Sequence, residues 1–305
     1  MSKLITIFGA TGNQGGSVIN HILADPQLSA EFKIRGITRD PTKPAAQELQ
    51  KRGVEVVTAN LNSVESLRIA LKGSHTIFLV TNYWEYVDKG TEVTQGKNVA
   101  DVARELSVQH LIFSSLVHVT DSTNGRLSHV PHFDGKAEIE RYIRASGVPC
   151  TFVLAGYFML NYLQMLKKGG DSTYQLFYPV NGSKAQFPLF DAASDTGLFV
   201  TAAIKHASEL NGKQILAAAG YYTAEEIVNI FTKETGKKAV FVSVSADQYK
   251  AVLPPPVAQE FLENHLLIES PGYFLGQSLD ESLKLLDAKP TSFADFVKKN
   301  AHAWQ

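Results

Sequence analysis

The first half of the chain alternates short apolar runs with longer segments in which apolar residues recur every three or four positions. The apolar runs are rich in β-branched and aromatic residues, as in buried strands. They span residues 4–9, 32–39, 54–60, 75–82, 110–116 and 150–157. The segments with helical spacing lie within residues 15–26, 44–53, 64–73, 96–108 and 135–147. Because parallel strands are joined by crossover helices, this alternation predicts a doubly wound α/β domain with helices on both faces of the sheet.

The pattern changes after residue 157. Residues 176–195 are rich in Pro, Gly and Asn, which is typical of a binding segment or a small hairpin. The apolar run 213–220 predicts one further buried strand that returns to the main sheet. We therefore predict two domains: a sheet-bearing domain at residues 1–157 and a smaller α/β domain at residues 158–305 over the carboxyl edge of the sheet.

Helix signals continue in the second half of the chain. Thr223 and Glu226 have the spacing of a capping box and predict the start of a helix. Further helices are expected within residues 245–265 and 291–304, and the proline run 254–256 should interrupt the first of them.

Composition and charge narrow the class of protein. The chain has 305 residues, 44% hydrophobic and 19% charged, with a net charge of −1, which is ordinary for a globular protein. It has no long basic run, so we expect no direct binding to nucleic acid or to a membrane surface. The chain shows no signal peptide and no run of roughly 18 apolar residues, which favours a cytoplasmic location, with the nucleus as the alternative. The single cysteine, Cys150, is expected to be a buried small hydrophobic residue.

Three glycines, Gly9, Gly12 and Gly15, stand between the first predicted strand and the first predicted helix. A glycine at the first position permits a tight turn, the second allows the backbone to approach a pyrophosphate, and the third allows close packing of helix on strand. The helix N-terminus adds N–H groups and the positive end of a dipole. The pattern therefore predicts a Rossmann-type dinucleotide site. Its contacts would come from Gly9, Thr11, Gly12, Asn13, Gln14 and Gly15.

The end of the second strand is where such folds select their cofactor. Arg39 stands where a guanidinium can bind a 2′-phosphate, with Lys43 as a second positive charge, which predicts NADP(H). Asp40 could instead point inward, and Arg39 could be a solvated surface charge. Asn60 ends the third strand, where it would either meet the adenine edge or form a strand-end turn.

Polar and aromatic residues also follow the fourth strand. Thr81, Asn82 and Tyr83 lie where ligands bind outside the carboxyl ends of a parallel sheet, and we expect them beside the ribose and nicotinamide. The alternative is an aromatic loop packed on the core.

Several stretches together resemble the short-chain dehydrogenase/reductase superfamily in its atypical NmrA-like branch. The stretches are "FGATGNQGGSV", "TRDPTK", "VTNYWE", "HFDGK" and "AGYFMLNYL". They are most similar to the NADPH-sensor proteins of the HSCARG type, over essentially the whole chain. The resemblance implies NADP(H) at the glycine turn. It also implies cofactor contacts from Arg39, Lys43, Thr81, Asn82, Tyr83, Lys136, Tyr157, Phe158 and Asn161. Asn60 and Ala155 depart from the residues common in that branch, an aspartate and a proline.

Active members of the superfamily use a Tyr-x-x-x-Lys pair with a serine on the preceding strand. Here His132 replaces the tyrosine, Lys136 is the lysine, and Ser114 or Ser115 would be the serine. An imidazolium can donate a proton, but a neighbouring ammonium opposes its formation. Unless a carboxylate compensates, His132 is a poor replacement acid. His132 and Lys136 are therefore the candidate catalytic residues of a site with little or no dehydrogenase activity.

The sequence leaves two main functions open. The first is a redox sensor that binds NADP(H) and acts through a regulatory protein partner or a homodimer, for example in transcriptional regulation. The cofactor would order the loops 81–90 and 118–130. The alternative is an NADPH-dependent reductase of a small carbonyl, quinone or enone, with its substrate under residues 176–190 and with Lys136 and His132 in proton transfer. A third reading is a scaffold that binds no dinucleotide. The histidines lack the spacing of a zinc site, so no metal is predicted.

Overall fold

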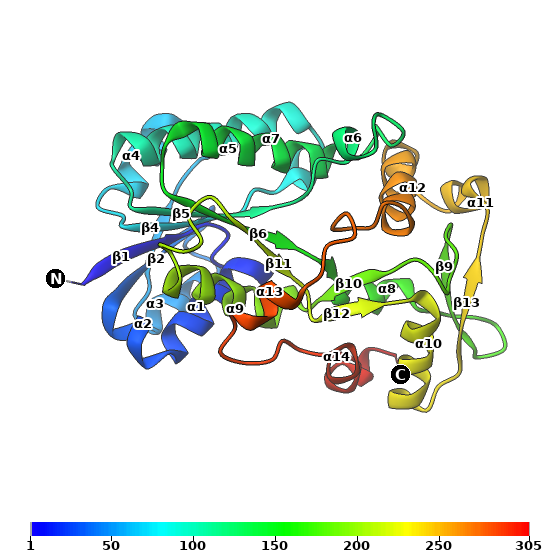
Figure 1. The fold of residues 1–305 in the computed structure, drawn as a ribbon. Helices are drawn as coiled ribbons and strands as arrows, with labels where there is room; N and C mark the ends of the chain where they lie inside the picture. Colours follow the sequence, from blue (N-terminus) through cyan, green and yellow to red (C-terminus); the bar gives the residue numbers. More distant parts are fainter. Residues whose placement is uncertain (1, 305) are drawn as a thin grey trace.

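A seven-stranded parallel sheet forms the centre of the computed structural model, which describes residues 2–304 (Figure 1). Its strands are β1 (Lys3–Ile7), β2 (Phe32–Thr38), β3 (Glu55–Thr58), β4 (Thr76–Leu79), β5 (His110–Ser115), β6 (Cys150–Ala155) and β11 (Gln214–Ala217). Their order is β11-β6-β5-β4-β1-β2-β3. This confirms the predicted doubly wound sheet, and β11 pairs with β6 within it. Cys150 is buried, as predicted, and burial raises the pKa of its thiol.

Helices cover both faces of this sheet (Figure 1). One face carries α1 (Asn13–Ala24), α2 (Pro26–Glu31), α3 (Pro44–Lys51) and α9 (Ala192–Lys205). The other carries α4 (Val64–Leu71), α5 (Lys89–Glu105) and α7 (Pro131–Ser146). Two hydrophobic clusters result, one under each layer of helices. Strands β4, β5 and β6 are buried at every position, because helices cover both faces of the sheet around them.

Helix α9 belongs to the second half of the chain but packs closely on α1. The Ser17 hydroxyl donates to the carbonyl of Ser194 at 2.9 Å and accepts the N–H of Gly197 at 2.9 Å. A Cβ on Gly197 would lie 2.3 Å from the carbonyl oxygen of Ser17. Only glycine therefore permits α1 and α9 to pack this closely. Helix α9, which lies beyond residue 157, completes the layer of helices on this face of the main sheet.

The rest of the second half forms two small sheets, ordered β12-β10-β7 and β13-β9-β8. Their strands are β7 (Tyr157–Phe158), β8 (Lys167–Lys168), β9 (Tyr174–Tyr178), β10 (Phe187–Phe190), β12 (Gly220–Tyr222) and β13 (Ala239–Ser243). The hairpin considered for residues 176–195 is wrong. Strand β9 pairs with β13 and β8, whereas β10 pairs with β12 and β7, so the intervening turn connects two different sheets.

The remaining helical elements lie after β4, after β5 and in the second half of the chain. They are α6 (Val119–Ser122), α8 (Tyr162–Met165), α10 (Ala224–Thr235), α11 (Ala246–Ala251), α12 (Pro255–Glu269), α13 (Asp280–Lys284) and α14 (Phe293–Lys299), with 3₁₀ turns η1 (Tyr83–Glu85), η2 (Met159–Asn161) and η3 (Ala301–Trp304). Helix α10 starts with the predicted capping box of Thr223 and Glu226. The proline run separates α11 from α12, as predicted.

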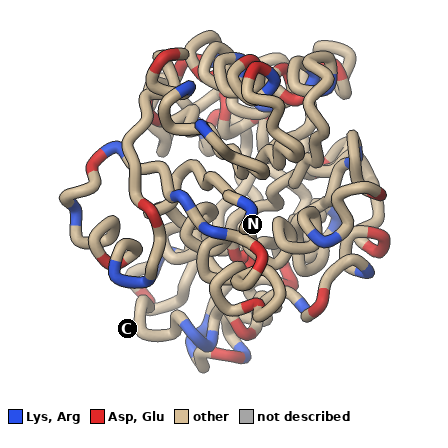
Figure 2. Tube along the Cα trace, turned by 90° about the vertical axis from the view of Figure 1, so that its left-hand side faces the viewer, with Lys and Arg blue, Asp and Glu red and all other residues tan. Residues whose placement is uncertain are grey.

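Acidic and basic residues are mixed along the visible chain in Figure 2, and neither sign gathers on that face. Across residues 2–304, every helix is too short or too polar to span a lipid bilayer.

Candidate functional site

A cavity of about 820 Å³ opens at the carboxyl ends of the parallel strands. Ligands bind at this edge of open α/β sheets. Its lining includes most of the residues predicted for the site, namely Gly9, Thr11, Gly12, Asn13, Gln14, Gly15, Arg39, Thr81, Asn82, Tyr83, His132, Lys136, Tyr157, Phe158 and Asn161. Lys43 and Asn60 are not among the lining residues. Helix α12, and no residue of 176–190, forms the far wall, so the cavity does not lie where the sequence placed a substrate.

The glycine turn has the geometry of an anion cradle. Gly9 has a φ of +64°, a conformation that favours glycine, and its carbonyl accepts the N–H of Gly12 at 2.8 Å. A Cβ on Gly15 would lie 2.3 Å from that same carbonyl oxygen, so the third glycine permits helix α1 to approach the turn. Gly12 caps α1 without any side-chain hydrogen bond. The N–H groups of the first turn therefore lie beside the cavity without a side-chain acceptor, which suits the diphosphate of a dinucleotide.

Arg39 lies at the edge of the cavity, just after β2. Its side chain is 76% exposed, and Nη1 lies 2.9 Å from Oε1 of Glu85, which follows β4. Asp40 does not turn inward, because its carboxylate accepts the N–H and hydroxyl of Thr42 at 2.9 and 2.6 Å. These hydrogen bonds lower the pKa of Asp40. The guanidinium is therefore the cation that this strand end presents to the cavity.

Two further predicted contacts lie outside the cavity lining. Lys43 is the N-cap residue of α3 and is exposed. The side-chain oxygen of Asn60 accepts the N–H of Asn62 at 3.0 Å, which is the strand-end turn considered as its alternative. Contacts of these two residues with a cofactor stay predictions.

A buried ion pair fixes Lys136. Its Nζ lies 2.5 Å from Oε1 of Glu92 on α5 and 3.0 Å from the hydroxyl of Thr81. The Thr81 hydroxyl donates to the same carboxylate oxygen at 2.7 Å. Gly135 allows the two helices to meet here, because a Cβ at that position would lie 3.1 Å from Oε2 of Glu92. The ammonium of Lys136 is thus neutralised by a carboxylate that the sequence analysis did not identify.

A second buried carboxylate, Glu260 of α12, binds His132. Its Oε1 accepts a hydrogen bond from ring Nδ1 of His132 and from the backbone N–H of His132 at 3.3 Å. Its Oε2 accepts the hydroxyl of Tyr83 at 3.2 Å. Glu260 is only 5% exposed. Burial and then the charge of Glu260 raise the pKa of Tyr83, so the phenol stays protonated and donates.

This pairing orients the imidazole. With Nδ1 directed to Glu260, the other ring nitrogen, Nε2, makes no hydrogen bond to any described residue, and His132 lines the cavity. A carboxylate that accepts from one ring nitrogen sets the tautomer and the orientation of the ring. Glu260 is therefore a carboxylate in contact with His132, which is the condition that the sequence analysis set for proton donation. Sequence alone could not have revealed it, because α12 mixes polar and apolar residues on all sides, as helices buried on several sides do.

Aromatic side chains cover the same end of the cavity. Trp84 stacks on Phe261 with ring centroids 5.4 Å apart and lies 5.0 Å from the ring of His132. Phe133 meets Tyr273 edge to face at 5.2 Å. This end of the cavity is therefore suited to a flat, apolar ligand.

The two candidate serines differ in their partners. The hydroxyl of Ser114 donates to the side chain of Gln14 at 2.8 Å, which connects β5 to the glycine turn. The hydroxyl of Ser115 donates to Glu140 at 2.6 Å. Both residues line the cavity.

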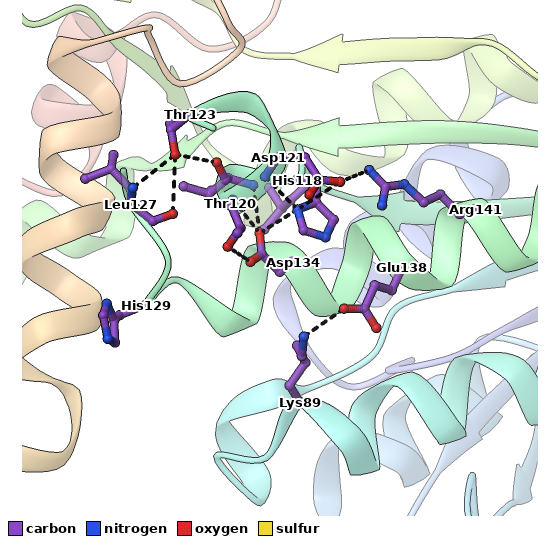
Figure 3. A network of polar contacts seen from close by, with 12 residues as sticks. Lys89, His118, Thr120, Asp121, Thr123, Leu127, His129, Asp134, Glu138 and Arg141 are labelled. Atoms are coloured by element: carbon purple, nitrogen blue, oxygen red, sulfur yellow. Dashed lines mark hydrogen bonds and ion pairs between the residues drawn. The ribbon is translucent and has the colours of Figure 1, made fainter. Parts of the chain in front are cut away.

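Hydrogen bonds anchor the loop 118–130, which the sequence analysis expected to be ordered by the cofactor. Figure 3 shows Asp134 at the centre of the network, where it contacts His118 and Thr120. The N–H of Val119 donates to Asp134 at 2.7 Å, and the N–H of His129 donates to Glu263 of α12 at 2.7 Å. The loop is therefore tied to both α7 and α12.

The fold and the cavity define a doubly wound Rossmann protein with a glycine turn at its first crossover. The model of the NmrA-like family matches residues 1–297, and the chain belongs to that family. Among its relatives, the NmrA-like family domain-containing oxidoreductase ptmS of Penicillium ochrochloron is 33% identical over 264 residues, 79% of this chain and 76% of the relative. An NmrA-like family domain-containing protein of Dictyostelium discoideum is 30% identical over 312 residues, 98% of both chains.

Solved structures show the same fold. NmrA, a negative transcriptional regulator whose complex with NADP has been solved, has a TM-score of 0.82 at 23% identity, covering 98% of this chain and 95% of its own. The triphenylmethane reductase of Citrobacter sp., complexed with NADP(H), has a TM-score of 0.79 at 23% identity, with 97% and 99% covered. The NADPH-dependent quinone oxidoreductase of Escherichia coli, complexed with NADPH, has a TM-score of 0.77 at 25% identity, with 97% and 99% covered.

Proposed function

We propose that this protein is an NADP(H)-dependent reductase of small conjugated carbonyl compounds, such as quinones or enones. The observation that carries the proposal is the buried pair of His132 and Glu260 at the cavity wall. The regulator hypothesis rested on the resemblance to NADPH-sensor proteins and on the missing tyrosine. The separate expectation that His132 is a poor acid assumed no nearby carboxylate, and Glu260 accepts from the imidazole. Two of the similar proteins, ptmS and the quinone oxidoreductase of Escherichia coli, are named as oxidoreductases, which agrees with the proposal.

The residues at the other end of the cavity fit the cofactor. The glycine turn and the N-terminus of α1 would hold the diphosphate, Arg39 would bind the 2′-phosphate in exchange for Glu85, and Lys136 would bind the nicotinamide ribose. The preference for NADP(H) rests on Arg39, since no carboxylate at the end of β2 turns toward the cavity. The cofactor, when bound, supplies the hydride.

The protein would supply the proton and an apolar surface for the substrate. Ring Nε2 of His132 donates its proton to the acceptor oxygen as hydride reaches the conjugated carbon, and solvent reprotonates the imidazole after the product leaves. Glu260 accepts from Nδ1 and holds the ring in place. Glu92 pairs with Lys136, so the ammonium on the same helix is not an unpaired charge. The stacked rings of Trp84 and Phe261 give this end of the cavity an apolar surface.

A cofactor-dependent regulator of the HSCARG type is the second candidate. It is favoured by an exposed apolar segment just after Trp84, formed by Tyr86 and Val87, with Glu85 beside them. Because Glu85 pairs with Arg39, cofactor binding would alter this segment and any protein partner or second copy seated on it. A regulator of this kind would bind NADPH and turn over no acceptor.

Anaerobic stopped-flow with NADPH and a panel of quinones and enones tests the proposal. We expect the unmodified protein to oxidise NADPH. The kcat should fall roughly 100-fold in His132→Gln and in Glu260→Gln, while the affinity for NADPH is retained. Glu263→Gln is the matched control, because Glu263 lies on the same helix and pairs with His129 outside the cavity lining. Tight NADPH binding without turnover of any acceptor would reject the reductase in favour of the regulator.

A further inference from the structure

Asn264 is a buried polar residue that lines the cavity, and its side-chain oxygen has no partner. The residue is 8% exposed, and within residues 2–304 its Oδ1 accepts no hydrogen bond. Buried amides in native proteins are almost always hydrogen-bonded, because an unmatched donor or acceptor is costly. An amide also offers both a donor and an acceptor. Asn264 therefore points to a ligand with a complementary polar group.

Its position on α12 places this group near the proton donor. Asn264 follows Glu260 by four residues, so the two lie about one helical turn apart on one side of the helix. Glu260 holds His132, and Phe261 between them stacks on Trp84. The polar atom, the imidazole and the aromatic surface thus belong to one wall of the cavity.

The opposite side carries the residues suited to the cofactor. These come from the strand ends of the main sheet and from α1 and α7, whereas Asn264 comes from α12 in the second half of the chain. The wall formed by α12 is therefore available to a second ligand while the strand-end side holds a dinucleotide.

We infer that Trp84, Phe261 and Asn264 form a substrate subsite for a planar quinone or enone that carries a hydroxyl group. Its rings lie against Trp84 and Phe261, and its hydroxyl donates a hydrogen bond to Oδ1 of Asn264. The assignment deepens the proposed reductase function and rests on it for the identity of the ligand as substrate. The binding site itself is tested without turnover.

Calorimetric titration with 2-naphthol and 2-methoxynaphthalene tests the subsite. The two probes share a flat ring system, but only the first has a hydroxyl donor. We expect 2-naphthol to bind about fivefold more tightly, the worth of one neutral hydrogen bond. Asn264→Leu should reduce this difference to less than twofold and leave the affinity for 2-methoxynaphthalene unchanged. Trp84→Ala should weaken both probes about tenfold.

Each part of the inference would be overturned by a different result. A fivefold preference that persists in Asn264→Leu, or equal binding of both probes to the unmodified protein, overturns the role of Asn264. No binding of either probe overturns the subsite. Because these titrations use no cofactor, they can succeed even if NADPH is never oxidised. In that outcome the subsite holds a regulatory ligand, and the reductase function alone is lost.

Discussion

The imidazole of His132 and the carboxylate of Glu260 are 128 positions apart in the sequence and share a buried hydrogen bond. The contact joins α7, which flanks the main sheet, to α12 of the second half. In the proposed mechanism this contact orients His132 as the proton donor. The site therefore depends on both halves of the chain.

A double-mutant cycle should detect this coupling in stability. We expect His132→Gln and Glu260→Gln each to lower the free energy of unfolding, and the double variant to lose less than their sum by about 1.5 kcal/mol. Urea denaturation of the four proteins measures it. The pair of His129 and Glu263 serves as control, because the His129 side chain is 63% exposed and its coupling should be clearly smaller. Additive effects at His132 and Glu260 would contradict a functional pair.

Arg39 and Glu85 should set the choice of cofactor in opposite directions. Arg39→Ala should weaken NADPH binding about tenfold and leave NADH unchanged, since only the 2′-phosphate needs the guanidinium. Glu85→Gln should tighten NADPH binding severalfold, because the carboxylate no longer competes for Arg39. Calorimetry with both cofactors measures this. Arg68→Ala, which removes a different exposed arginine paired with Glu105, should change neither affinity. Equal weakening of both cofactors in Arg39→Ala would remove the basis for NADP(H) selection.

Gly15→Ala should damage the cradle itself. The new Cβ would lie 2.3 Å from the carbonyl oxygen of Gly9, and backbone on both sides prevents an easy shift. We expect about 1–3 kcal/mol of lost stability and a large loss of NADPH affinity. Gly170→Ala is the control, because a Cβ there meets no atom within 4 Å. A thermal unfolding scan with and without NADPH compares them, and unaltered binding by Gly15→Ala would argue against a diphosphate at this turn.

His265 should make the fold sensitive to acid. Burial lowers its pKa to about 4, whereas an unfolded imidazole titrates near 6.5. Between these values the unfolded chain binds a proton that the folded protein does not, so stability falls as the pH falls from about 6.5 to 4. The slope is about 1.4 kcal/mol per pH unit inside this window. Urea unfolding at several pH values should show a shallower slope for His265→Gln.

His302→Gln provides the comparison for the acid experiment, since His302 is exposed and its replacement should leave the slope as it was. His110 has a pKa lowered by burial to about 4 as well, so some acid sensitivity remains in His265→Gln. A slope that His265→Gln leaves unchanged would mean that the imidazole is not buried and neutral in solution.

Local features of the sequence were enough to predict one end of the site. The glycine turn forms where a strand passes directly into a helix, and its three glycines act on neighbours a few residues away. Likewise, Lys136 follows His132 by four residues, so a single helix places both on one side of α7. Short-range relations of this kind can be predicted from the spacing of residues along the sequence. The arrangement of the two small sheets was not predicted, because β9 and β10 pair with strands that lie far from them in the sequence.

The sequence by itself determined the parallel sheet and the glycine turn at its first crossover. Only the tertiary structure decided which charged groups His132 and Lys136 meet, because Glu260 and Glu92 reach them from other helices. The physical reason is that a buried charge takes its character from the groups packed around it, and those groups are selected by folding rather than by distance along the chain.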